Sequence, residues 1–414
     1  MRVGLFTQWY EPEPARMPPV LAGGLASRGH DVRVLTGFPN FPEGRLYDGY
    51  RITWRKDCVV SGIPVRRVAL YPDHSRSVKG RLANYGSFAL TGSVCSGGWF
   101  KDTESIWVYS WPSVVLPLWV MKARYRPQIV LHVMDIWPET LFASGFGGAL
   151  ERHRVLKHGL DRLIAATYGV ADKVVCISRS QIELLAERGV PRDKLHYGPI
   201  WADEDVFHPA ERDDALAAEL GVSDKTVLMY AGALGEAQGL ETLIGVCARL
   251  TGEPSFHCLV AGYGLAETRL RAAAQARGLK NITFLGRWPV QDMTRLMSVG
   301  DVHLVSLSPD PLAAIAIPSK VPATLACAKP LIVAARGETA TVVERSGAGW
   351  ITRPGAVDEL EAAVRSALLA GRDALQQIGL RARTFYESEF SVDIGVSRVE
   401  QLLTGQERQE RDAA

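Results

Sequence analysis

The stretch AGALGEAQGLETLI, residues 231–244, places three glycines between two different periodic patterns. The apolar run before it, residues 227–230, predicts a strand, and the residues from 240 onward predict a helix. Glycines let a backbone approach a ligand closely, and the first amides of a helix attract anions. The spacing therefore predicts a phosphate-binding turn. The charged side chains within this turn are Glu236 and Glu241, so a neutralising cation must come from another part of the chain.

Two basic residues follow other strand-like runs and are candidates for that cation. Lys320 follows a Pro-Ser turn beyond the run DVHLVSLS, and Arg287 directly follows FLG. Both are expected at the carboxyl ends of strands, which is also where the glycine turn must lie. A solvated surface charge is the alternative for each residue, because most lysine and arginine side chains are exposed.

The elements that must position these residues alternate between strand and helix from the first residue. Residues 3–7, 18–28 and 32–36 predict a β-α-β unit, with Gly29 as the helix stop. Further strands of a first parallel sheet are predicted at residues 105–109, 128–133 and 173–177. A segment with proline and aspartate, residues 197–214, interrupts the pattern, which then restarts with TVLMYAG, FHCLVAGYG, ITFLG, DVHLVSLS and PLIVAA.

This alternation predicts an α/β fold with two Rossmann-like, doubly wound parallel-sheet domains. We expect an N-terminal domain at residues 1–198, a C-terminal domain at 199–390, and a C-terminal helix with a disordered tail at 391–414. Ligands of such sheets bind at the carboxyl ends of the strands, so a cleft between the two domains is the expected site.

The composition excludes several classes of protein. The 414 residues are 47% hydrophobic, and a net charge of +2 with a pI of about 8.2 does not favour a nucleic-acid partner. The six cysteines show no C-x-x-C spacing and lie mostly in apolar surroundings, which predicts reduced core thiols of a cytoplasmic protein. The strand-like VGLF at the start leaves no room for a signal peptide. The longest apolar run, residues 111–121, is too short to span a bilayer.

Five motifs resemble retaining glycosyltransferases of family 4 and come in that family's order. They are the glycine turn at 231–244, AGYG at 261–264, FLGR at 284–287, PSK at 318–320 and RSGAGW at 345–350. In the N-terminal half, RGHDVRVLTGFPNFPEG and HVMDIWPET resemble the subgroup that adds sugars, often amino sugars, during surface-polysaccharide assembly. The resemblance covers nearly the whole chain. It implies the GT-B fold, in which two Rossmann-like domains face each other across a cleft.

The resemblance also implies an activity and a set of site residues. The donor is expected to be a nucleotide-diphosphate sugar, UDP-linked, and the acceptor a lipid-linked saccharide or a small molecule, with no metal and no cofactor. The N-terminal domain would hold the acceptor, the C-terminal domain the donor, and the last helix would return to the first domain. The candidate catalytic residues are Asp135 and Lys320. The candidate donor-binding residues are Gly232, Ala233, Leu234, Gly235, Gln238, Gly264, Arg287, Trp288, Pro318, Ser319 and Glu338. The candidate acceptor-binding residues are Glu13, Arg16, His132 and Trp137.

The chemistry of sugar transfer gives these residue types a reason. Negative charge develops on the leaving diphosphate, so cations and amide donors around it accelerate transfer. Lys320 and the amides of residues 232–235 are expected to supply them. A carboxylate at the end of a strand, such as Asp135, can orient a sugar hydroxyl, and a helix N-cap or turn residue ahead of Pro138 is its alternative. Glu338 either caps the following helix or meets the donor sugar.

Several family positions carry different residues in this chain. The wider family's arginine and lysine in the glycine turn correspond to Ala233 and Gln238, and its paired glutamates correspond to Ile315 and Ala323. A family histidine that helps to hold the donor sugar corresponds to Met134. Two other classes stay open: a nucleotide-sugar epimerase of the same fold, and a noncatalytic nucleotide- or sugar-binding protein, which the missing charges favour.

Some of the candidate residues also have plain structural interpretations. A satisfied core histidine is the alternative for His132, and a surface arginine is the alternative for Arg16, which follows the first strand. The acidic string at 203–205 resembles a D-x-D metal motif, but its position beside prolines in the expected hinge disfavours metal binding. The first strand lacks G-x-G-x-x-G, which disfavours a nicotinamide oxidoreductase.

Basic residues concentrate between positions 51 and 81 and lead into the apolar residues 88–90. Eight basic residues against two aspartates leave this segment a net charge of +6. We expect it to make peripheral contact with an anionic membrane in a salt-dependent way, with a solvated face as the alternative. The basic residues are Arg51, Arg55, Lys56, Arg66, Arg67, Arg76, Lys79 and Arg81.

Overall fold

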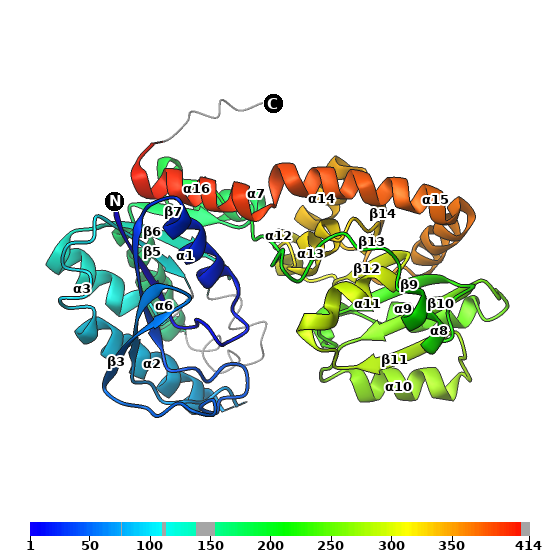
Figure 1. Cartoon of the computed structure of the whole chain (residues 1–414), viewed down its shortest axis with the longest axis horizontal. Helices are drawn as coiled ribbons and strands as arrows, with labels where there is room; N and C mark the ends of the chain where they lie inside the picture. The colour runs from blue at the N-terminus through cyan, green and yellow to red at the C-terminus, as the bar shows by residue number, and fades with distance from the viewer. Residues whose placement is uncertain (76, 110–112, 138–153, 407–414) are drawn as a thin grey trace. The chain divides into compact units, whose positions relative to one another are not determined.

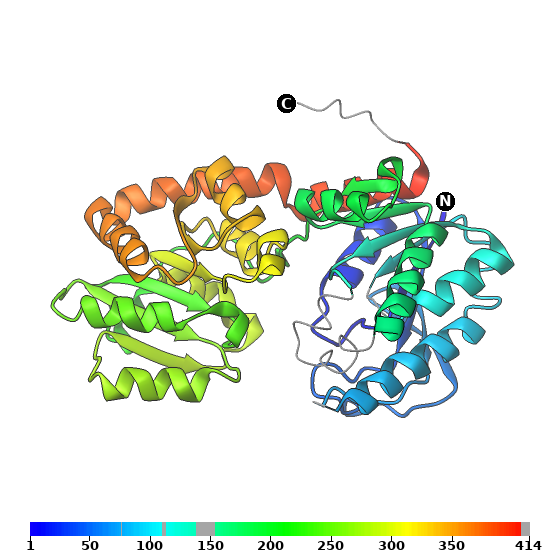
Figure 2. The same ribbon diagram turned by 180° about the vertical axis from the view of Figure 1, so that it is seen from behind.

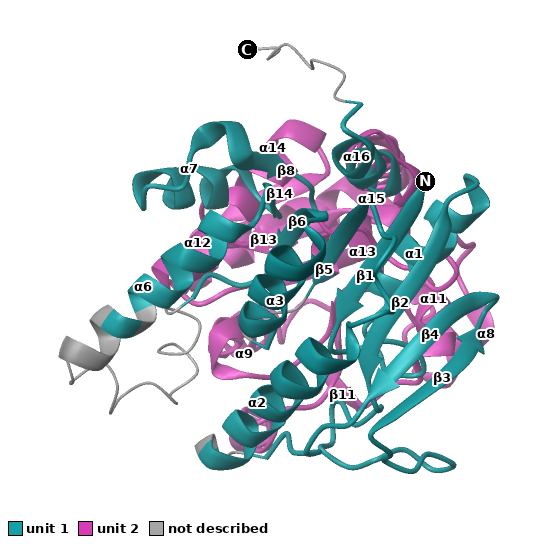
Figure 3. Ribbon diagram, turned by 90° about the vertical axis from the view of Figure 1, so that its left-hand side faces the viewer, with its two compact units in different colours: residues 1–199, 395–414 teal, residues 200–394 magenta. Residues whose placement is uncertain are grey.

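The computed structural model describes residues 1–75, 77–109, 113–137 and 154–406, and the chain divides into two compact units. Unit 1 comprises Met1–Pro199 with Gly395–Ala414, and unit 2 comprises Ile200–Ile394 (Figure 3). The expected domain boundary was at 198/199. Part of the expected disordered tail, residues 407–414, lies outside the described residues.

Unit 1 is built on one eight-stranded sheet (Figure 1). Its strand order is β3-β4-β2-β1-β5-β6-β7-β8, and every pair except β3 with β4 is parallel. The strands are β1 (Arg2–Thr7), β2 (Asp31–Gly37), β3 (Arg55–Val60), β4 (Ile63–Val68), β5 (Ser105–Tyr109), β6 (Gln128–Val133), β7 (Lys173–Cys176) and β8 (Leu195–Tyr197). The helices are α1 (Met17–Ser27), α2 (Val78–Cys95), α3 (Val115–Tyr125), α6 (Arg154–Val170) and α7 (Arg179–Glu187), with a 3-10 turn, η1 (Arg192–Lys194).

The first β-α-β unit forms as the sequence predicts. Proline stands in the first turn of α1, where a missing N–H costs nothing, and Gly29 follows the helix with a φ of 88°. The chain then returns as β2, parallel to β1, with Arg2 opposite Asp31. The apolar side chains of α1, led by Leu21 and Leu25, are buried.

One hairpin was not anticipated from the sequence. Strands β3 and β4 pair antiparallel across a two-residue turn, Ser61–Gly62, in which both residues have a positive φ, of 50° and 80°. Such a turn matches the twist of the flanking strands. The segment from 51 to 81 therefore contributes the edge of the sheet.

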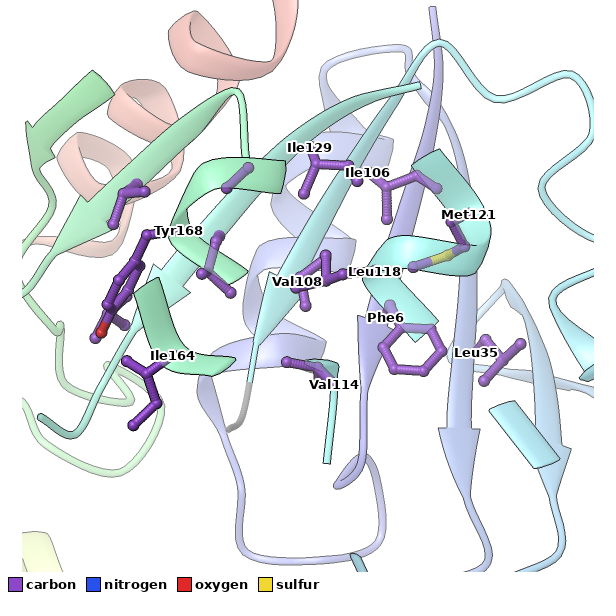
Figure 4. Close-up of a cluster of buried hydrophobic side chains, with 14 of the residues drawn as sticks. Phe6, Leu35, Ile106, Val108, Val114, Leu118, Met121, Ile129, Ile164 and Tyr168 are labelled. Carbon is purple, nitrogen blue, oxygen red and sulfur yellow. The ribbon is translucent and has the colours of Figure 1, made fainter. Parts of the chain in front are cut away.

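One hydrophobic core of unit 1 lies between the sheet and a row of three helices. Alternate strand residues such as Phe6, Ile106 and Val108 meet Leu118 and Met121 of α3 (Figure 4). Helices α2, α3 and α6 lie side by side over this face, as the blue, cyan and green helices of Figure 2 show. Burying each such side chain contributes about 1.5–3 kcal/mol, so this face holds the sheet edge and its loops in place.

The C-terminal helix α16 (Val392–Thr404) packs on unit 1 from Gly395 onward. Val396 fills the space beside Gly24 of α1, where an added Cβ would lie 2.9 Å from it. Glu400 accepts hydrogen bonds from Arg28 at 2.8 Å and from His30 at 2.7 Å. Glu400 thereby anchors the chain end beside the turn between α1 and β2.

Unit 2 contains a six-stranded, fully parallel sheet in the order β11-β10-β9-β12-β13-β14. The strands are β9 (Thr226–Ala231), β10 (Phe256–Ala261), β11 (Ile282–Gly286), β12 (Val302–Ser306), β13 (Leu331–Ala334) and β14 (Gly349–Thr352). The helices are α8 (Asp214–Glu219), α9 (Glu241–Arg249), α10 (Glu267–Ala276), α11 (Met293–Val299), α12 (Pro311–Ile315), α13 (Lys320–Ala326), α14 (Glu338–Ser346) and α15 (Val357–Glu389), with 3-10 turns η2 (Glu236–Gln238) and η3 (Val290–Asp292).

The inner strands of unit 2 are buried on both faces, as continuous apolar runs predict for a parallel sheet. Tyr230 and Val260 face a core completed by α9 and α15, whereas Met229 and Leu259 face a second cluster with α11. Because all six strands are parallel, their carboxyl ends meet at one edge, and the loops that follow them form the candidate site.

Candidate active site

The glycine turn follows β9 at the carboxyl edge of the second sheet. Gly232 has a φ of 147°, and its amide donates to the Ala261 carbonyl at 2.9 Å. Gly262 follows β10 with a φ of 141°, and a Cβ there would lie 1.8 Å from the Gly232 oxygen. Gly264 is equally confined, because its Cβ would lie 2.3 Å from the Leu234 carbonyl oxygen. The loops after β9 and β10 are thus pressed together by backbone contacts that only glycine permits.

This contact uses amides that we had expected to cradle a phosphate. Besides Gly232, Leu234 donates its amide to the Tyr263 carbonyl at 3.0 Å, and Gly235 donates to Oε1 of Gln238 at 2.9 Å. These three N–H groups are engaged within the protein in this conformation. Ala233 is exposed, and its amide makes no hydrogen bond to any of the described residues. Gln238 corresponds to the family's lysine position, and its side chain accepts a backbone N–H group of the same turn.

Lys320 lies directly against the glycine turn. It is the first residue of α13, and its Nζ lies 3.1 Å from the position that a Cβ on Gly232 would take. Nζ donates to the Tyr230 hydroxyl at 2.8 Å and lies 4.3 Å from the centroid of that ring. Although part of the side chain stays exposed, the surrounding protein disfavours its charged form and lowers the pKa of Lys320 to about 8. Tertiary packing therefore brings a cation to the turn that lacks one.

Tyr230 holds this cation and was missed in the sequence. Its ring is buried at the end of β9, and its hydroxyl donates to the Ala233 carbonyl at 2.6 Å while accepting from Lys320. Burial raises the pKa of Tyr230 well above its ordinary value, so the hydroxyl stays protonated. A lone tyrosine in the otherwise aliphatic run TVLMYA was the available signal.

Arg287 and Trp288 follow β11 at the same edge. The Arg287 guanidinium lies 5.0 Å from the centroid of the Tyr263 ring, and its side chain is exposed. The Trp288 indole N–H donates to the Asp292 carbonyl at 3.3 Å. Tyr263 belongs to the loop that also accepts from Leu234, so Arg287 borders the glycine turn through this ring.

The loops after β12 and β13 surround a cavity of about 230 Å³. Its lining includes Ser308, Ala313 and Arg336, and Arg336 immediately precedes the turn that starts α14. Gly337 has a φ of 65°, and its Cβ would lie 2.1 Å from the Ala314 carbonyl oxygen. Arg336 is a cation at this edge that our sequence analysis did not single out.

The remaining donor-side candidates flank α13 and α14. Pro318 is half-buried, and Ser319 is the exposed N-cap residue of α13, with no side-chain capping bond. Glu338 begins α14 as its first-turn acid, a position that favours the helix dipole. Ala323, which corresponds to one of the family's paired glutamates, is buried within α13. A carboxylate is therefore absent from that position of the site.

In unit 1, Asp135 follows β6 at the carboxyl edge of the first sheet. Burial is the main reason that the pKa values of Tyr85 and Tyr109 are raised, and the charge of Asp135 raises both further, so both phenols lie near this carboxylate. Surrounding protein raises the pKa of Asp135 itself, yet its side chain is exposed. The water-facing side of Asp135 is enough to solvate its ionised carboxylate. Residues 138–140 of the same motif lie outside the described residues.

Two acceptor-side candidates of β6 have different surroundings. His132 is 1% exposed and packs edge-on against Trp107 at 5.7 Å and Tyr109 at 6.4 Å between ring centroids. Its Nε2 is 3.0 Å from the Gly198 carbonyl oxygen, and burial lowers the pKa of His132 to about 4. His132 is therefore a buried core residue, in agreement with the alternative interpretation of this histidine. Trp137 is half-buried, and its carbonyl accepts from Arg188 at 3.1 Å.

Glu13 is a structural carboxylate rather than an exposed acceptor contact. It is 1% exposed and accepts backbone N–H groups from Tyr10 at 3.1 Å, Asn40 at 2.8 Å and Phe41 at 2.9 Å. Burial outweighs these hydrogen bonds and raises the pKa of Glu13 to about 7. Glu13 joins the loop after β1 to the loop after β2. Arg16, at the start of α1, is exposed.

Two residues of the D-x-D string make hydrogen bonds within unit 2. Glu204 accepts from the Tyr386 hydroxyl at 2.9 Å and from the Val392 amide at 3.0 Å, and the Asp203 carbonyl accepts from the Phe207 amide at 2.7 Å. In the part of the chain that the structure describes, no group of three His, Cys, Asp or Glu side chains is arranged to hold a metal ion. All six cysteines are free thiols, five of them buried, as predicted.

Fewer basic side chains of the segment from 51 to 81 reach the surface than the count of charges in the sequence predicts. Arg66 is buried and pairs with Asp57 through two hydrogen bonds of 2.7 Å, and Arg67 is 1% exposed and donates to the carbonyls of Gly37 and Glu11. Those two arginines hold strands and loops near the edge of the sheet together.

None of the helices in the described ranges is long and apolar enough to cross a membrane.

Comparison with known proteins gives one consistent family. Residues 15–201 match the glycosyl transferase 4-like domain, and residues 212–385 match glycosyl transferases group 1. The chain is 30% identical over 353 residues, 83% of its length and 86% of the relative, to the putative colanic acid biosynthesis glycosyl transferase WcaI of Escherichia coli K12.

Solved structures with the same architecture match nearly the whole chain. HepE of Anabaena, solved in complex with UDP, aligns with a TM-score of 0.71 at 16% identity and covers 98% of this chain and 100% of HepE. WaaG, a glycosyltransferase involved in lipopolysaccharide biosynthesis, aligns with a TM-score of 0.65 at 16% identity and covers 98% and 100%. The chain therefore belongs to the family-4 glycosyltransferases, and its two parallel-sheet domains have the GT-B fold.

Proposed function

We propose that this glycosyltransferase moves a sugar from a UDP-linked donor to a lipid-linked saccharide, with retention of the anomeric configuration. The observation that carries the donor side is Lys320 Nζ, held by the Tyr230 hydroxyl against the glycine turn. A cation at that place neutralises the leaving diphosphate, whose charge grows as the sugar departs. The likeness to HepE, which was solved with UDP and with UDP-glucose, supports a uridine nucleotide.

In this proposal, different residues of unit 2 bind the diphosphate, the base and the sugar of the donor. Lys320 and the exposed amide of Ala233 contact the diphosphate, while Arg287 and Trp288 frame the base through their backbone. Arg336 and Glu338 stand at the start of α14, beside the cavity after β12, and contact the sugar. Donor binding by side-chain cation and backbone amide needs no metal and no cofactor.

Asp135 of unit 1 orients the reacting sugar or its acceptor. An exposed carboxylate at the end of β6 can accept hydrogen bonds from sugar hydroxyls, and in retention the leaving phosphate takes the proton of the acceptor. The relationship to WcaI supports an acceptor used in polysaccharide assembly, with a small-molecule acceptor as the second choice. We place this reaction in the cytoplasm, at the inner face of the membrane.

A thermal-shift screen against UDP, GDP and dTDP tests the donor. The preferred nucleotide at 100 times its dissociation constant stabilises the fold by about 2.7 kcal/mol, so one base should raise the melting temperature above the other two. Equal shifts, or none, would contradict a uridine-selective site. NMR of the new linkage tests retention, which an inverted product refutes.

Incubation with donor alone separates transfer from the other two functions. A transferase releases free sugar slowly by hydrolysis, an epimerase returns a changed nucleotide sugar, and a noncatalytic binder leaves the donor intact. Either of the last two results would replace the proposed activity.

The membrane contact is a separate part of the proposal. Arg55 and Lys56 of β3 and Lys79 of α2 are exposed, and Leu82 and Leu90 of α2 are 64% and 61% exposed. Exposed cations beside apolar side chains suit an anionic bilayer. Flotation with vesicles containing phosphatidylglycerol should show binding at low salt that high salt removes. Failure to float at low salt would exclude this contact.

A further inference from the structure

Three aromatic rings meet at the carboxyl edge of the first sheet, in a place that our sequence analysis passed over. Trp9 follows β1, Phe41 follows β2 and His74 follows β4. Ring centroids are 4.9 Å apart for Trp9 and Phe41, 5.3 Å for Phe41 and His74, and 6.2 Å for Trp9 and His74. Each of the three side chains is partly exposed, so the cluster is not part of the closed core.

A chain of buried amides lies beside the rings. Gln8 Nε2 donates to Asn84 Oδ1 at 2.6 Å, and Asn84 Nδ2 donates to Asn40 Oδ1 at 3.2 Å and to the Tyr71 carbonyl at 2.7 Å. Gln8, Asn40 and Asn84 are each 0% exposed. Gln8 precedes Trp9 and Asn40 precedes Phe41, so the amide chain and the ring cluster belong to the same two loops.

Three polar atoms of this neighbourhood are buried and have no hydrogen-bond partner among the residues that the structure describes. They are Gln8 Oε1, Trp9 Nε1 and His74 Nε2. Leaving a buried donor or acceptor unpaired is costly, and native proteins tolerate few such groups. Three in one cluster, at the ligand-binding edge of a doubly wound sheet, indicate that a polar molecule completes them.

Glu13 holds the two loops that carry Trp9 and Phe41 through hydrogen bonds to their backbone. Its Oε1 accepts the amides of both Asn40 and Phe41, and its Oε2 accepts the amide of Tyr10, next to Trp9. The two ring-bearing loops are therefore tied to a single carboxylate. Glu13 acts on the cluster through these loops and is a positioning residue.

The chemistry of the cluster selects the kind of ligand. Rings offer an apolar face to C–H groups, and amides pair with hydroxyls as donor and acceptor together. Burial lowers the pKa of His74 to about 4, so the rings and amides carry no charge near neutral pH. A pyranose ring has an apolar C–H face and hydroxyl edges and is neutral.

We propose that Trp9, Phe41 and His74, with the Gln8 amide, form a subsite for a pyranose ring of the acceptor. This inference rests on the proposed function for its identification of the ligand as an acceptor. It commits the acceptor to a saccharide rather than a flat aromatic molecule, which would stack on the rings without using the amides.

Saturation-transfer-difference NMR tests the subsite with methyl pyranosides of glucose, galactose, fucose and N-acetylglucosamine as probes. At least one probe should receive saturation from the wild-type protein, and Trp9→Ala or Phe41→Ala should reduce that signal at least about fivefold. Trp9→Phe keeps a ring and should retain part of it. Trp119→Ala, which removes a 39% exposed ring of α3, is the matched control and should leave the signal unchanged.

The outcomes that overturn the subsite are distinct from those that overturn the donor. No saturation of any pyranoside by the wild type, full signal in both alanine variants, or saturation of p-nitrophenol alone would each refute it. A UDP thermal shift on the same variants shows that they are folded. If the wild type binds a pyranoside but does not bind UDP, the proposed donor is wrong and the proposed subsite is still supported.

Discussion

The pH dependence of UDP binding tests the position of Lys320 most directly. An ordinary lysine keeps its charge to about pH 10, whereas the pKa of Lys320 is lowered to about 8 by its protein surroundings. The terminal phosphate of UDP titrates near pH ~6, so above neutrality the ligand holds a constant charge. Any loss of affinity between pH ~7 and ~9 then reports the protein.

The magnitude follows from the protonated fraction. If the ammonium form alone binds well, a pKa of about 8 leaves about 90% of the protein competent at pH ~7 and about 10% at pH ~9. UDP affinity should therefore fall about tenfold across this interval, which is about 1.4 kcal/mol. The sign is definite: the charge is present below the folded pKa and is lost as the pH rises through it.

Isothermal titration at several pH values, with three variants, is the assay. Lys320→Ala should weaken UDP binding by roughly 10- to 150-fold at neutral pH, as expected for a charge-assisted contact of about 1.5–3 kcal/mol, and should flatten the profile. Lys320→Arg keeps a charge at every pH used and should bind with a flat profile. Gln238→Lys in the Lys320→Ala background should recover part of the affinity, because it returns a cation to the turn.

One result would refute this reasoning. If Lys320→Ala binds UDP and turns over donor as the wild type does, the diphosphate is neutralised by another group, with Arg336 the first to examine. A flat wild-type profile with a weak Lys320→Ala variant would keep the contact but contradict the lowered pKa. Tyr230→Phe removes the hydroxyl that holds Nζ but keeps the amine. It should therefore weaken UDP binding less than Lys320→Ala does.

Other parts of the molecule give further expectations. Asp135→Asn should lower transfer with the melting temperature nearly unchanged, and equal losses of both in a thermal melt would favour a structural role. Because the pKa of Glu13 is raised in the folded protein, the free energy of unfolding should fall as the pH rises through about 7. Denaturant titrations of Glu13→Gln should show a smaller slope of this free energy against pH. An unchanged slope would mean that another group causes the pH dependence. Gly262→Ala, with its Cβ 1.8 Å from the Gly232 oxygen, should cost more than about 1 kcal/mol in unfolding and also weaken UDP binding; a neutral effect would mean that the paired loops separate easily.

Local patterns were sufficient to predict two parallel sheets and most of their strands, although not the edge hairpin of the first sheet. Residues 105–109 and 128–133 form strands with the predicted bounds, because buried parallel strands must be continuous apolar runs. Gly29 ends α1 as expected, since a left-handed backbone conformation favours glycine. The family also followed from the order of short motifs, which mark the turns where backbone and ligand come close. These features depend on a few consecutive residues and so are visible in the chain.

What surrounds each candidate side chain was decided only in three dimensions. Burial assigned His132 to the core and Glu13 to a joint between loops, because solvent exposure depends on distant segments that pack over a residue. Arg66 does not contribute to the predicted basic surface because Asp57 of the unforeseen hairpin pairs with it, and Arg67 does not because it is buried and donates to the carbonyls of Gly37 and Glu11. A count of charges in the sequence carries no information on such pairing.

The same distinction separates the glycine turn from the site that it belongs to. The chain shows that residues 231–244 form a turn without a cation, whereas only packing brings Lys320 to Tyr230, some 90 positions away. Packing also assigns the amide of Leu234 to the carbonyl of Tyr263 in the loop after β10. The spacing of residues along the chain determines local conformation, but hydrogen-bond partners are chosen by the approach of separate strands and helices, which depends on the whole core.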